Sequence, residues 1–342
     1  MANAKKSLLL LLILSFVISC KKDVDVITDD DVYNLIIPDG WPAPVYNFEN
    51  NNITKDGFEL GRKLFYDPIL SRDNTIACGN CHQQFAGFAH LDHAVSHGIN
   101  DLNGKRNAPS LSNLIWMPDL MWDGGVHHIE LQPVAAITNP VEMDETVANV
   151  VSKLQAHSSY PSMFNKAFGT DAIDSQLMLR AITQFTGMLV SYQSKYDDYI
   201  AGNATFSQQE LSGLNLFRQN CASCHTEPLF TDFNFINNGL DQTFADSGRA
   251  VITNDVNDLG KFKVPSLRNV EKSYPYMHDG RFKNLTEVLN HYATGIKQSP
   301  TLHTSLQNGI TLSTTQQQEI ISFLQTLTDN KFIKDKRFAE VQ

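Results

Sequence analysis

The sequence is poor in cysteine and in positive charge. Only five of its 342 residues are cysteine, and 27 lysines and arginines stand against 37 aspartates and glutamates, for a formal net charge of −10. A chain with this balance has no general attraction for nucleic acid or for an anionic surface, so we expect no nucleic-acid partner. Strand-like alternation of any length is also missing, which leaves helices as the expected regular structure.

The N-terminus lacks an apolar run long enough to cross a membrane comfortably. The run from Leu8 to Ile18 follows two lysines and is typical of an export signal. It ends in Val-Ile-Ser-Cys, which resembles a bacterial lipobox with Cys20 as the lipidated residue. An ordinary signal peptide that contains a cysteine is the alternative. Either way we expect a mature chain in the periplasm or cell envelope, and the lipobox predicts an anchor through Cys20.

No cysteine is left over for a structural disulfide, because four of the five form two CxxC pairs, each followed by histidine. The residues of these two CxxCH motifs are Cys78, Cys81, His82, Cys221, Cys224 and His225. A thioredoxin-like pair does not explain a histidine after each CxxC, whereas c-type haem attachment does. The thiols add to the haem vinyl groups and the imidazole binds the iron. The sequence therefore predicts two covalently bound haem c groups with proximal histidines.

The length and the hydrophobic fraction of 42% suit two domains of ordinary size. We expect a lipoprotein signal peptide over 1–20 and a polar, flexible tether over 21–52. A first haem domain would span 53–203 and a second 204–342. The predicted fold class is mainly α, with two cytochrome c-like domains packed together.

Helical periodicity precedes each haem motif. Apolar residues recur at helical spacing after Thr54, and again after Ser207, where Glu210 three positions later predicts a capping box. Further periodic stretches lie at 144–153, 175–199 and 314–328. Each CxxCH is thus expected just after a short helix.

The two halves repeat one another. Pro-Ser-Leu-Ser-Asn at 109–113 returns as Pro-Ser-Leu-Arg-Asn at 265–269, and Met-Trp-Asp-Gly at 121–124 returns as Met-His-Asp-Gly at 277–280. Both pairs are 156 positions apart, whereas the motif cysteines are 143 apart. An internal duplication explains this pattern. The first half has the longer connection, over 83–106, where a loop could cover a distal haem face.

From about Thr54 onward, the ordered motifs resemble the bacterial di-haem cytochrome c peroxidases and the related MauG proteins. The resemblance is carried by Gly-Lys-Arg-Asn-Ala-Pro at 104–109, by Trp-Asp-Gly at 122–124, and by the segments around Gln132 and Glu142. It implies an inter-haem electron relay at Trp122, and Gln132 and Glu142 over a peroxide-binding haem held by His82. We expect Glu142 to be the acid/base and Gln132 to be its hydrogen-bonding neighbour.

The chemistry of peroxide cleavage also favours a catalytic role for Glu142, independently of the resemblance. Splitting an O–O bond needs a group that moves a proton between the two oxygens, and a buried carboxylate beside an open iron can do this. A glutamate that only decorates a loop is the alternative for Glu142, and a packed core residue is the simpler interpretation of Trp122.

The second haem has two candidate distal ligands. Tyr292 stands where the resembled peroxidases have methionine and MauG proteins have tyrosine, and Met277 is the nearest methionine. A phenolate stabilises ferric iron, whereas a thioether raises the potential. Simple packing is the alternative for both. For the first haem, His97 is a candidate sixth ligand, with His90 and His93 also in reach.

The resemblance also implies a calcium ion between the domains, at positions that match Asn107, Lys263 and Pro265. The expected partners are hydrogen peroxide and a small donor protein, either a cytochrome c or a cupredoxin, and the chain acts alone or as a homodimer.

Three functions remain open from the sequence. A cytochrome c peroxidase would send donor electrons through the His225 haem, past Trp122, to peroxide at the His82 haem. A MauG-like enzyme would use peroxide to oxidise a protein side chain, for which Tyr292 is the best support. A plain electron-transfer cytochrome would need neither Gln132 nor Glu142.

Overall fold

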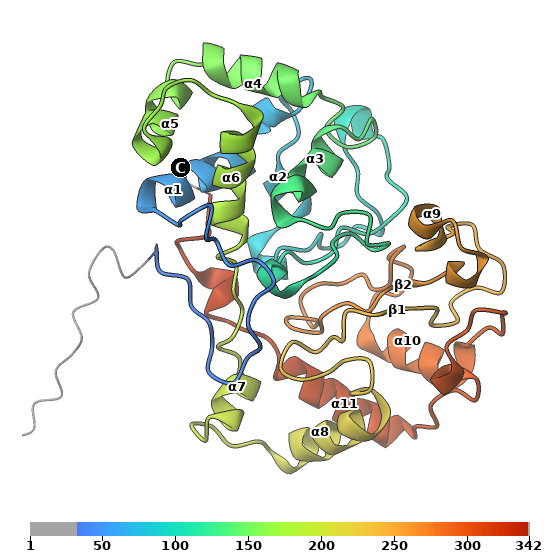
Figure 1. Ribbon diagram of the computed structural model, residues 1–342. Helices are drawn as coiled ribbons and strands as arrows, with labels where there is room; N and C mark the ends of the chain where they lie inside the picture. The colour runs from blue at the N-terminus through green and yellow to red at the C-terminus, as the bar shows by residue number, and fades with distance from the viewer. Residues whose placement is uncertain (1–32, 341–342) are drawn as a thin grey trace, which may run out of the picture. The chain divides into compact units, whose positions relative to one another are not determined.

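The structure is a computed structural model that describes residues 33–340. Its helices are α1 (Lys55–Tyr66), α2 (Cys78–Cys81), α3 (Gln132–Ile137), α4 (Val147–Ala156), α5 (Tyr160–Phe168), α6 (Ser175–Thr186), α7 (Lys195–Ile200), α8 (Gln208–Asn220), α9 (Ala250–Thr253), α10 (Leu285–Asn290) and α11 (Thr314–Gln325). Strands β1 (Phe235–Ile236) and β2 (Phe262–Lys263) pair antiparallel. The predicted mainly helical fold is confirmed (Figure 1). The expected signal peptide and Cys20 lie outside the described residues.

Polar caps fix where the helices start. The side chain of Thr54 accepts a hydrogen bond from the backbone of Gly57 and starts α1. The predicted capping box is present at α8: Ser207 Oγ accepts from the Glu210 backbone at 3.3 Å, and Glu210 Oε2 accepts from the Ser207 backbone at 2.6 Å. The periodic stretch at 175–199 is divided into α6 and α7, because Ser194 caps a new helix.

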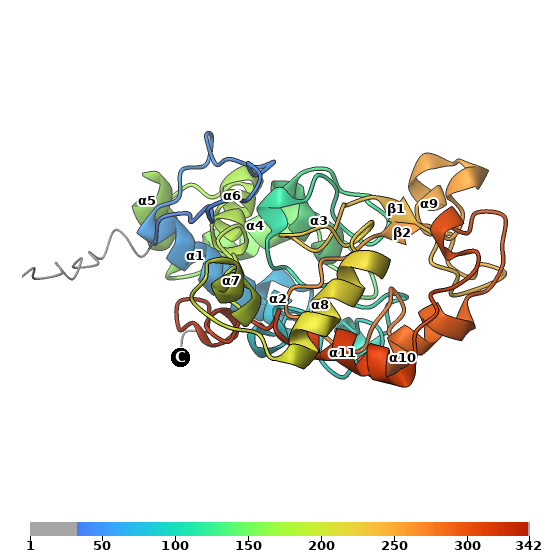
Figure 2. The ribbon, with the colours of Figure 1, turned by 90° about the horizontal axis from the view of Figure 1, so that it is seen from below.

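The same helix contact occurs in each half. Helix α1 packs against α6, and helix α8 packs against α11; Figures 1 and 2 both show α8 beside α11. At the two contacts stand Gly61, against the backbone of Ala181, and Gly213, against the backbone of Glu319. A side chain at either glycine would keep the two backbones apart. The repeated contact agrees with the predicted internal duplication.

Two of the buried clusters contain several aromatic side chains. One cluster contains Phe58, Phe88 and Phe185, and another contains Phe217 and Phe323. All five side chains are at most 1% exposed. Burying one such side chain contributes about 1.5–3 kcal/mol before entropy is subtracted. Cys78 packs against the first of these clusters and Cys221 against the other, so each CxxCH motif lies beside buried aromatic side chains.

Residues 33–52 differ from the expected flexible tether. Trp41 packs edge-on against Trp116 with ring centroids 5.0 Å apart, and Phe48 is 5% exposed. The Asn51 side chain donates to the Arg180 backbone oxygen at 3.0 Å. A few aromatic side chains are enough to hold this polar stretch on the core. The polar composition of the stretch does not reveal these contacts.

The two halves contact one another in more than one place. The C-terminal residues Phe332 and Phe338 pack in the cluster of Phe88, and the Tyr66 hydroxyl donates to the Phe338 backbone oxygen at 2.7 Å. Tyr196, on α7, packs on Phe230 of the second half. Contacts thus cross the boundary between 203 and 204, and the division into domains at that point stays a proposal.

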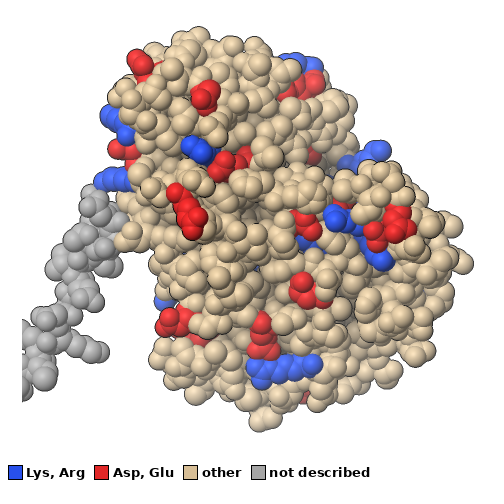
Figure 3. Space-filling model, in the orientation of Figure 1, with Lys and Arg blue, Asp and Glu red and all other residues tan. Residues whose placement is uncertain are grey.

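The helices between Tyr33 and Glu340 are all too short or too polar to cross a bilayer. On the face drawn in Figure 3, acidic and basic side chains lie in small separate groups. Charge on that face is mixed, and no continuous basic surface forms there among the described residues.

Replacing Gly213 by alanine tests the helix contact. A Cβ there would lie well inside van der Waals contact with the Glu319 backbone oxygen. We expect the Gly213→Ala chain to lose about 1–3 kcal/mol in the free energy of unfolding, despite the better helix propensity of alanine. Denaturant unfolding would measure this. Gln209→Ala, on the exposed side of the same helix, is the control and should change stability by less than about 0.5 kcal/mol. Equal stability of the two variants would contradict the close contact.

Candidate functional site

The first CxxCH motif lies shortly after α1. Cys78 and Cys81 begin and end the single turn of α2. The ring of His82 follows, and its Nδ1 donates to the Phe88 backbone oxygen at 2.9 Å. Because Nδ1 carries the proton, Nε2 keeps its lone pair and is the nitrogen available to a metal.

The second motif repeats this arrangement. Helix α8 ends at the residue before Cys221, and His225 Nδ1 donates to the Phe230 backbone oxygen at 3.0 Å. Burial lowers the pKa of His82 and of His225, although backbone hydrogen bonds oppose the shift. Both imidazoles are therefore neutral at ordinary pH, as coordination to iron requires.

The residues of both motifs fit a covalently attached haem. Each offers two cysteine thiols about one helical turn apart, none of them in a disulfide. Each also offers a neutral imidazole that is oriented by a backbone carbonyl, which is how proteins commonly hold a metal-binding histidine. The donors that haem c needs are thus in place twice.

Glu142 lies beside the first motif. It follows α3, where its backbone nitrogen donates to the Asn139 oxygen at 3.0 Å. Burial raises the pKa of the Cys81 thiol to about 11, and the charge of Glu142 adds to the rise. Burial also raises the pKa of Glu142, while hydrogen bonds from Asn139 and Ser96 oppose the shift. A carboxyl group with a raised pKa, next to a haem-binding thiol, is suited to proton transfer.

Gln132 is the first residue of α3, ten positions before Glu142. Within residues 33–340 no hydrogen bond joins the two side chains, so the pairing expected from the sequence is not formed directly. Both nevertheless belong to one short segment, α3 and the turn after it.

Trp122 lies at the junction between the duplicated segments. Its Nε1 donates to the Asn107 backbone oxygen at 2.8 Å. The Asn107 backbone nitrogen in turn donates to the oxygen of His278, which is the residue that matches Trp122 in the second half. The Lys263 backbone nitrogen donates to the Trp122 oxygen at 2.8 Å. Trp122 is therefore bonded to both halves of the chain, through its indole to Asn107 and through its backbone to Lys263.

Both candidate ligands of the second haem lie near one asparagine. Burial raises the pKa of Tyr292 to about 12, a hydrogen bond from Asn238 opposes this, and the nearby Cys221 and Cys224 add to it. Asn238 also donates to Met277 Sδ at 3.4 Å. Tyr292 itself lies in the π-helical turn η8 (His291–Gly295) after α10, and such turns are frequent at functional sites. The neighbourhood of the second motif is thus shared by the phenol and the thioether.

His97 lies close to the first motif, with the Cys81 sulfur 3.7 Å from its backbone oxygen. Its ring is grouped with those of His90 and His93, and one nitrogen from each lies within 4.8 Å of the others. Burial lowers the pKa of His90 to about 4, and the neighbouring histidines add to the shift. The three candidates are therefore one cluster.

The three positions expected around calcium are partly engaged. The Asn107 amide donates to the backbone oxygens of His93 and Ala94. Lys263 Nζ donates to the Asp119 oxygen at 2.8 Å, and burial lowers its pKa to about 8. The Pro265 backbone hydrogen-bonds with His225. Trp122 links Asn107 to Lys263, because its indole donates to the Asn107 oxygen and its backbone oxygen accepts from the Lys263 nitrogen.

Comparison with known proteins identifies the family. The model of the di-haem cytochrome c peroxidase family matches residues 55–205. The methylamine utilization protein MauG of Methylophilus methylotrophus is 33% identical over 301 residues, covering 85% of this chain and 86% of that protein. The cytochrome c551 peroxidase of Nitrosomonas europaea is 30% identical over 283 residues, covering 81% of each. The chain belongs to the di-haem cytochrome c peroxidase family.

A solved structure agrees with this assignment. A MauG-like protein associated with microbial copper homeostasis superposes with a TM-score of 0.82 and 29% identity, over 90% of this chain and 99% of that one. Membership in the di-haem family implies two haem c groups, as the two motifs predicted.

Two side chains of this di-haem peroxidase, those of Asn238 and Arg106, could not be assigned a role from the sequence. Asn238 is 54 positions from Tyr292 and carries no motif, so only the fold reveals it. Arg106 stands in the quoted stretch at 104–109, where its role was not visible: it forms ion pairs with Asp123 and Asp246 at 2.5 and 2.6 Å. The two carboxylates come from different halves, and this ion pair therefore joins the halves next to Trp122.

Removing the thiols of one motif tests haem attachment. We expect the Cys221→Ala/Cys224→Ala chain to keep one covalent haem instead of two, because the first motif is complete without the second. Haem staining of the denatured chain and the haem-to-protein ratio would measure this. Ser223→Ala, which changes a residue inside the same motif, should keep two. Two covalent haems in the double variant would refute the attachment site.

Proposed function

We propose that this chain is a peroxidase that reduces hydrogen peroxide to water with electrons from a small redox protein. The observation that carries the proposal is Glu142, a carboxyl group beside Cys81 whose pKa is raised by burial. Relatives named cytochrome c551 peroxidase support it as well. His82 would hold the haem at which peroxide reacts, and His225 the haem that receives donor electrons.

The haem groups, when bound, supply iron that takes up peroxide and iron that stores donor electrons. The protein moves the protons. Glu142 takes a proton from the inner oxygen of peroxide and returns it to the outer oxygen, which makes the outer oxygen a better leaving group. Gln132, the first residue of the same segment, would act beside Glu142 over the His82 haem. Each turnover consumes one peroxide, two electrons and two protons, and releases two water molecules.

Trp122 is proposed as the relay between the two haems. Its indole donates to the Asn107 backbone, which is bonded to His278 of the second half. A relay must be held rigidly to keep its distance from both partners. The Nε1 hydrogen bond ties the ring to a backbone that is itself bonded to the second half. The simple core role and the relay role are therefore compatible.

A MauG-like oxidation of a protein side chain is the second candidate, and Tyr292 favours it. The phenol is close enough to Cys221 and Cys224 for their charges to act on its pKa. A phenolate ligand favours ferric iron over ferrous iron, which suits an enzyme that withdraws electrons better than one that stores them. Met277, beside the same Asn238, would favour the peroxidase instead.

We also propose a location, a donor and further ligands for this chain. The chain would act in the periplasm or cell envelope, anchored by a lipid on Cys20, alone or as a homodimer. A cytochrome c or cupredoxin would be the donor. Calcium near Asn107, Lys263 and Pro265 is a family-based proposal, and Asn107 would need to turn its amide oxygen toward the ion. His97 is a candidate sixth ligand of the first haem at rest.

Peroxide turnover against reduced cytochrome c tests the function and the role of Glu142 together. Glu142 must be ionised to accept a proton, and its ionised fraction falls as the pH falls through its pKa. Because burial raises that pKa, the acid limb of kcat/KM should lie above the range of an ordinary glutamate. Glu142→Gln should lower turnover by about 10²–10⁴-fold and remove that limb.

Glu49→Gln, which alters an exposed carboxylate, is the matched control and should leave the profile unchanged. Full turnover in Glu142→Gln would remove the acid/base assignment. A wild-type chain with two haems and no peroxide turnover would remove the peroxidase.

Replacing the candidate ligands of the second haem separates the two functions. If Tyr292 is the ligand, Tyr292→Phe should raise the potential of that haem by on the order of 0.1 V or more, because an anionic oxygen no longer stabilises ferric iron. Met277→Leu should then leave the potential unchanged. Potentiometry with optical detection measures both. The reverse pattern, a fall in Met277→Leu and no change in Tyr292→Phe, would assign the thioether.

A further inference from the structure

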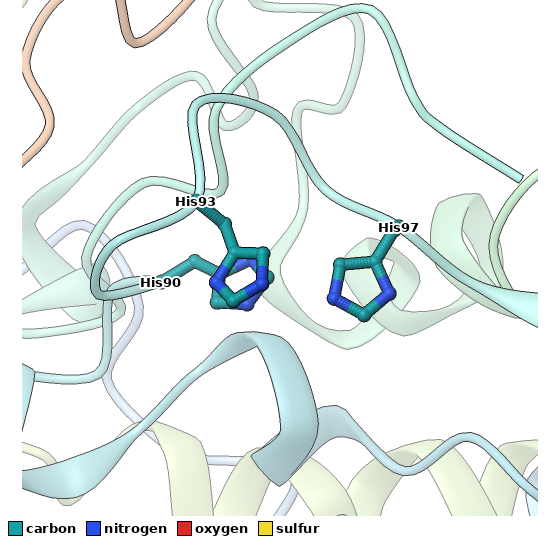
Figure 4. A group of neighbouring side chains, drawn as sticks. All are labelled: His90, His93 and His97. Atoms are coloured by element: carbon teal, nitrogen blue, oxygen red, sulfur yellow. The ribbon is translucent and has the colours of Figure 1, made fainter. Parts of the chain in front are cut away.

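Three histidines of the long first-half loop lie closely together. Figure 4 shows the rings of His90 and His93 overlapping, with the ring of His97 beside them. His90 and His93 stack with centroids 4.3 Å apart and an angle of 8° between their planes, and His97 is 4.8 Å from His93. One nitrogen of each ring lies within 4.8 Å of the other two.

The cluster contains a polar atom that no protein group satisfies. His90 is 2% exposed, and its Nδ1 is buried without a hydrogen-bond partner. A buried ring nitrogen in this state normally has a partner, and an ion is one of the partners that explain such a case. The ring of His90 lies beside two other imidazoles, with centroids 4.3 and 5.5 Å away. A metal ion is a partner that several imidazoles can share.

A second ring in the cluster is prepared to bind a metal. His93 Nδ1 donates to the Leu91 backbone oxygen at 3.1 Å. This bond places the proton on Nδ1 and leaves the Nε2 lone pair unused. A carbonyl that orients the other nitrogen is the usual support of a metal-binding histidine.

The loop that carries the histidines is fixed on both sides. The Asn107 amide donates to the His93 and Ala94 backbone oxygens at 3.0 and 3.2 Å. The Ser96 backbone donates to the Arg106 oxygen at 3.0 Å, and His97 pairs with Asn103 in an isolated bridge. Ligands held this way lose little conformational freedom when an ion binds.

We propose that His90, His93 and His97 form a binding site for one borderline divalent cation, copper(II) first and zinc(II) after it. Imidazole ligands suit these ions, whereas calcium and magnesium require oxygen ligands that the cluster does not contain. Three protein ligands leave a further coordination position open. The stacked rings of His90 and His93 need to rotate and close. The lone pair of an imidazole lies in the ring plane, and two ligands on one ion are no more than about 4.2 Å apart.

The site has a consequence for the first haem. A neutral imidazole offers one lone pair, so an ion that holds His97 keeps it from the haem iron. This consequence rests on the proposed function, whereas the ion site does not. The ion would therefore leave the first haem open to peroxide, and its removal would free His97.

Metal binding to the full chain with both haems attached tests the site. After treatment with a chelator and dialysis, we expect one copper(II) per chain by elemental analysis, with an electron paramagnetic resonance spectrum of nitrogen-ligated copper. Affinity should follow copper(II) > zinc(II) > manganese(II). His93→Ala alters an exposed ring and should weaken copper binding at least about tenfold. His157→Ala, an exposed histidine outside the cluster, is the matched control and should bind as the wild type does.

Two results would overturn the proposal. One is equal copper affinity in His93→Ala and His157→Ala. The other combines two observations: the wild-type chain binds no copper, and a low-spin signal of its first haem is lost in the His97→Ala chain. This result would assign His97 to the iron. A failure of peroxide turnover leaves both results unaffected, so the ion site and the proposed function can fail separately.

Discussion

The hydrogen bond from a histidine Nδ1 to a backbone carbonyl is the constraint on which both halves depend. It occurs at His82 with Phe88 and at His225 with Phe230. The bond decides which nitrogen faces a metal, and the aromatic clusters beneath it keep the carbonyl in place. The CxxCH chemistry requires that orientation, because a thioether-linked haem cannot turn to find its ligand. Duplication of the chain has preserved this bond while other positions diverged.

The surroundings of the two equivalent centres differ. Beside the first motif lies Glu142, a carboxyl with a raised pKa, and beside the second lie Tyr292 and Met277 around Asn238. In the proposed function, Glu142 would transfer protons at one centre, and Tyr292 or Met277 would be an axial ligand at the other. The Arg106 ion pairs and the Asn107 backbone join the halves near Trp122. Packing at this junction is what would set the distance for electron transfer.

The features that neighbouring residues determine could be predicted from the sequence, whereas contacts between distant residues could not. The haem motifs, the capping box at Ser207 and the duplication were visible because each is written in neighbouring residues or in a repeat. The packing of Trp41 on Trp116 was not, since a pair of aromatic rings in a polar stretch has no periodicity. Asn238 was missed for a related reason: one asparagine carries no pattern, and its neighbours are distant in sequence.

The loop that carries His90, His93 and His97 could be predicted only in part. Its three histidines were noticed as separate candidates, but only the fold shows that their nitrogens converge and that Asn107 holds the backbone behind them. Sequence spacing cannot supply this, because the loop is irregular and its path is set by contacts with residues 103–107.

Electron paramagnetic resonance of the oxidised and half-reduced chain, before and after addition of peroxide, tests the central claim that the two haems are unequal. We expect one low-spin haem and one high-spin haem, and the signal of the high-spin haem should change on adding peroxide. The low-spin haem is held ferric if Tyr292 is its ligand and is otherwise reduced first. Two low-spin haems in both states, with no response to peroxide, would contradict it and would leave a plain electron-transfer cytochrome.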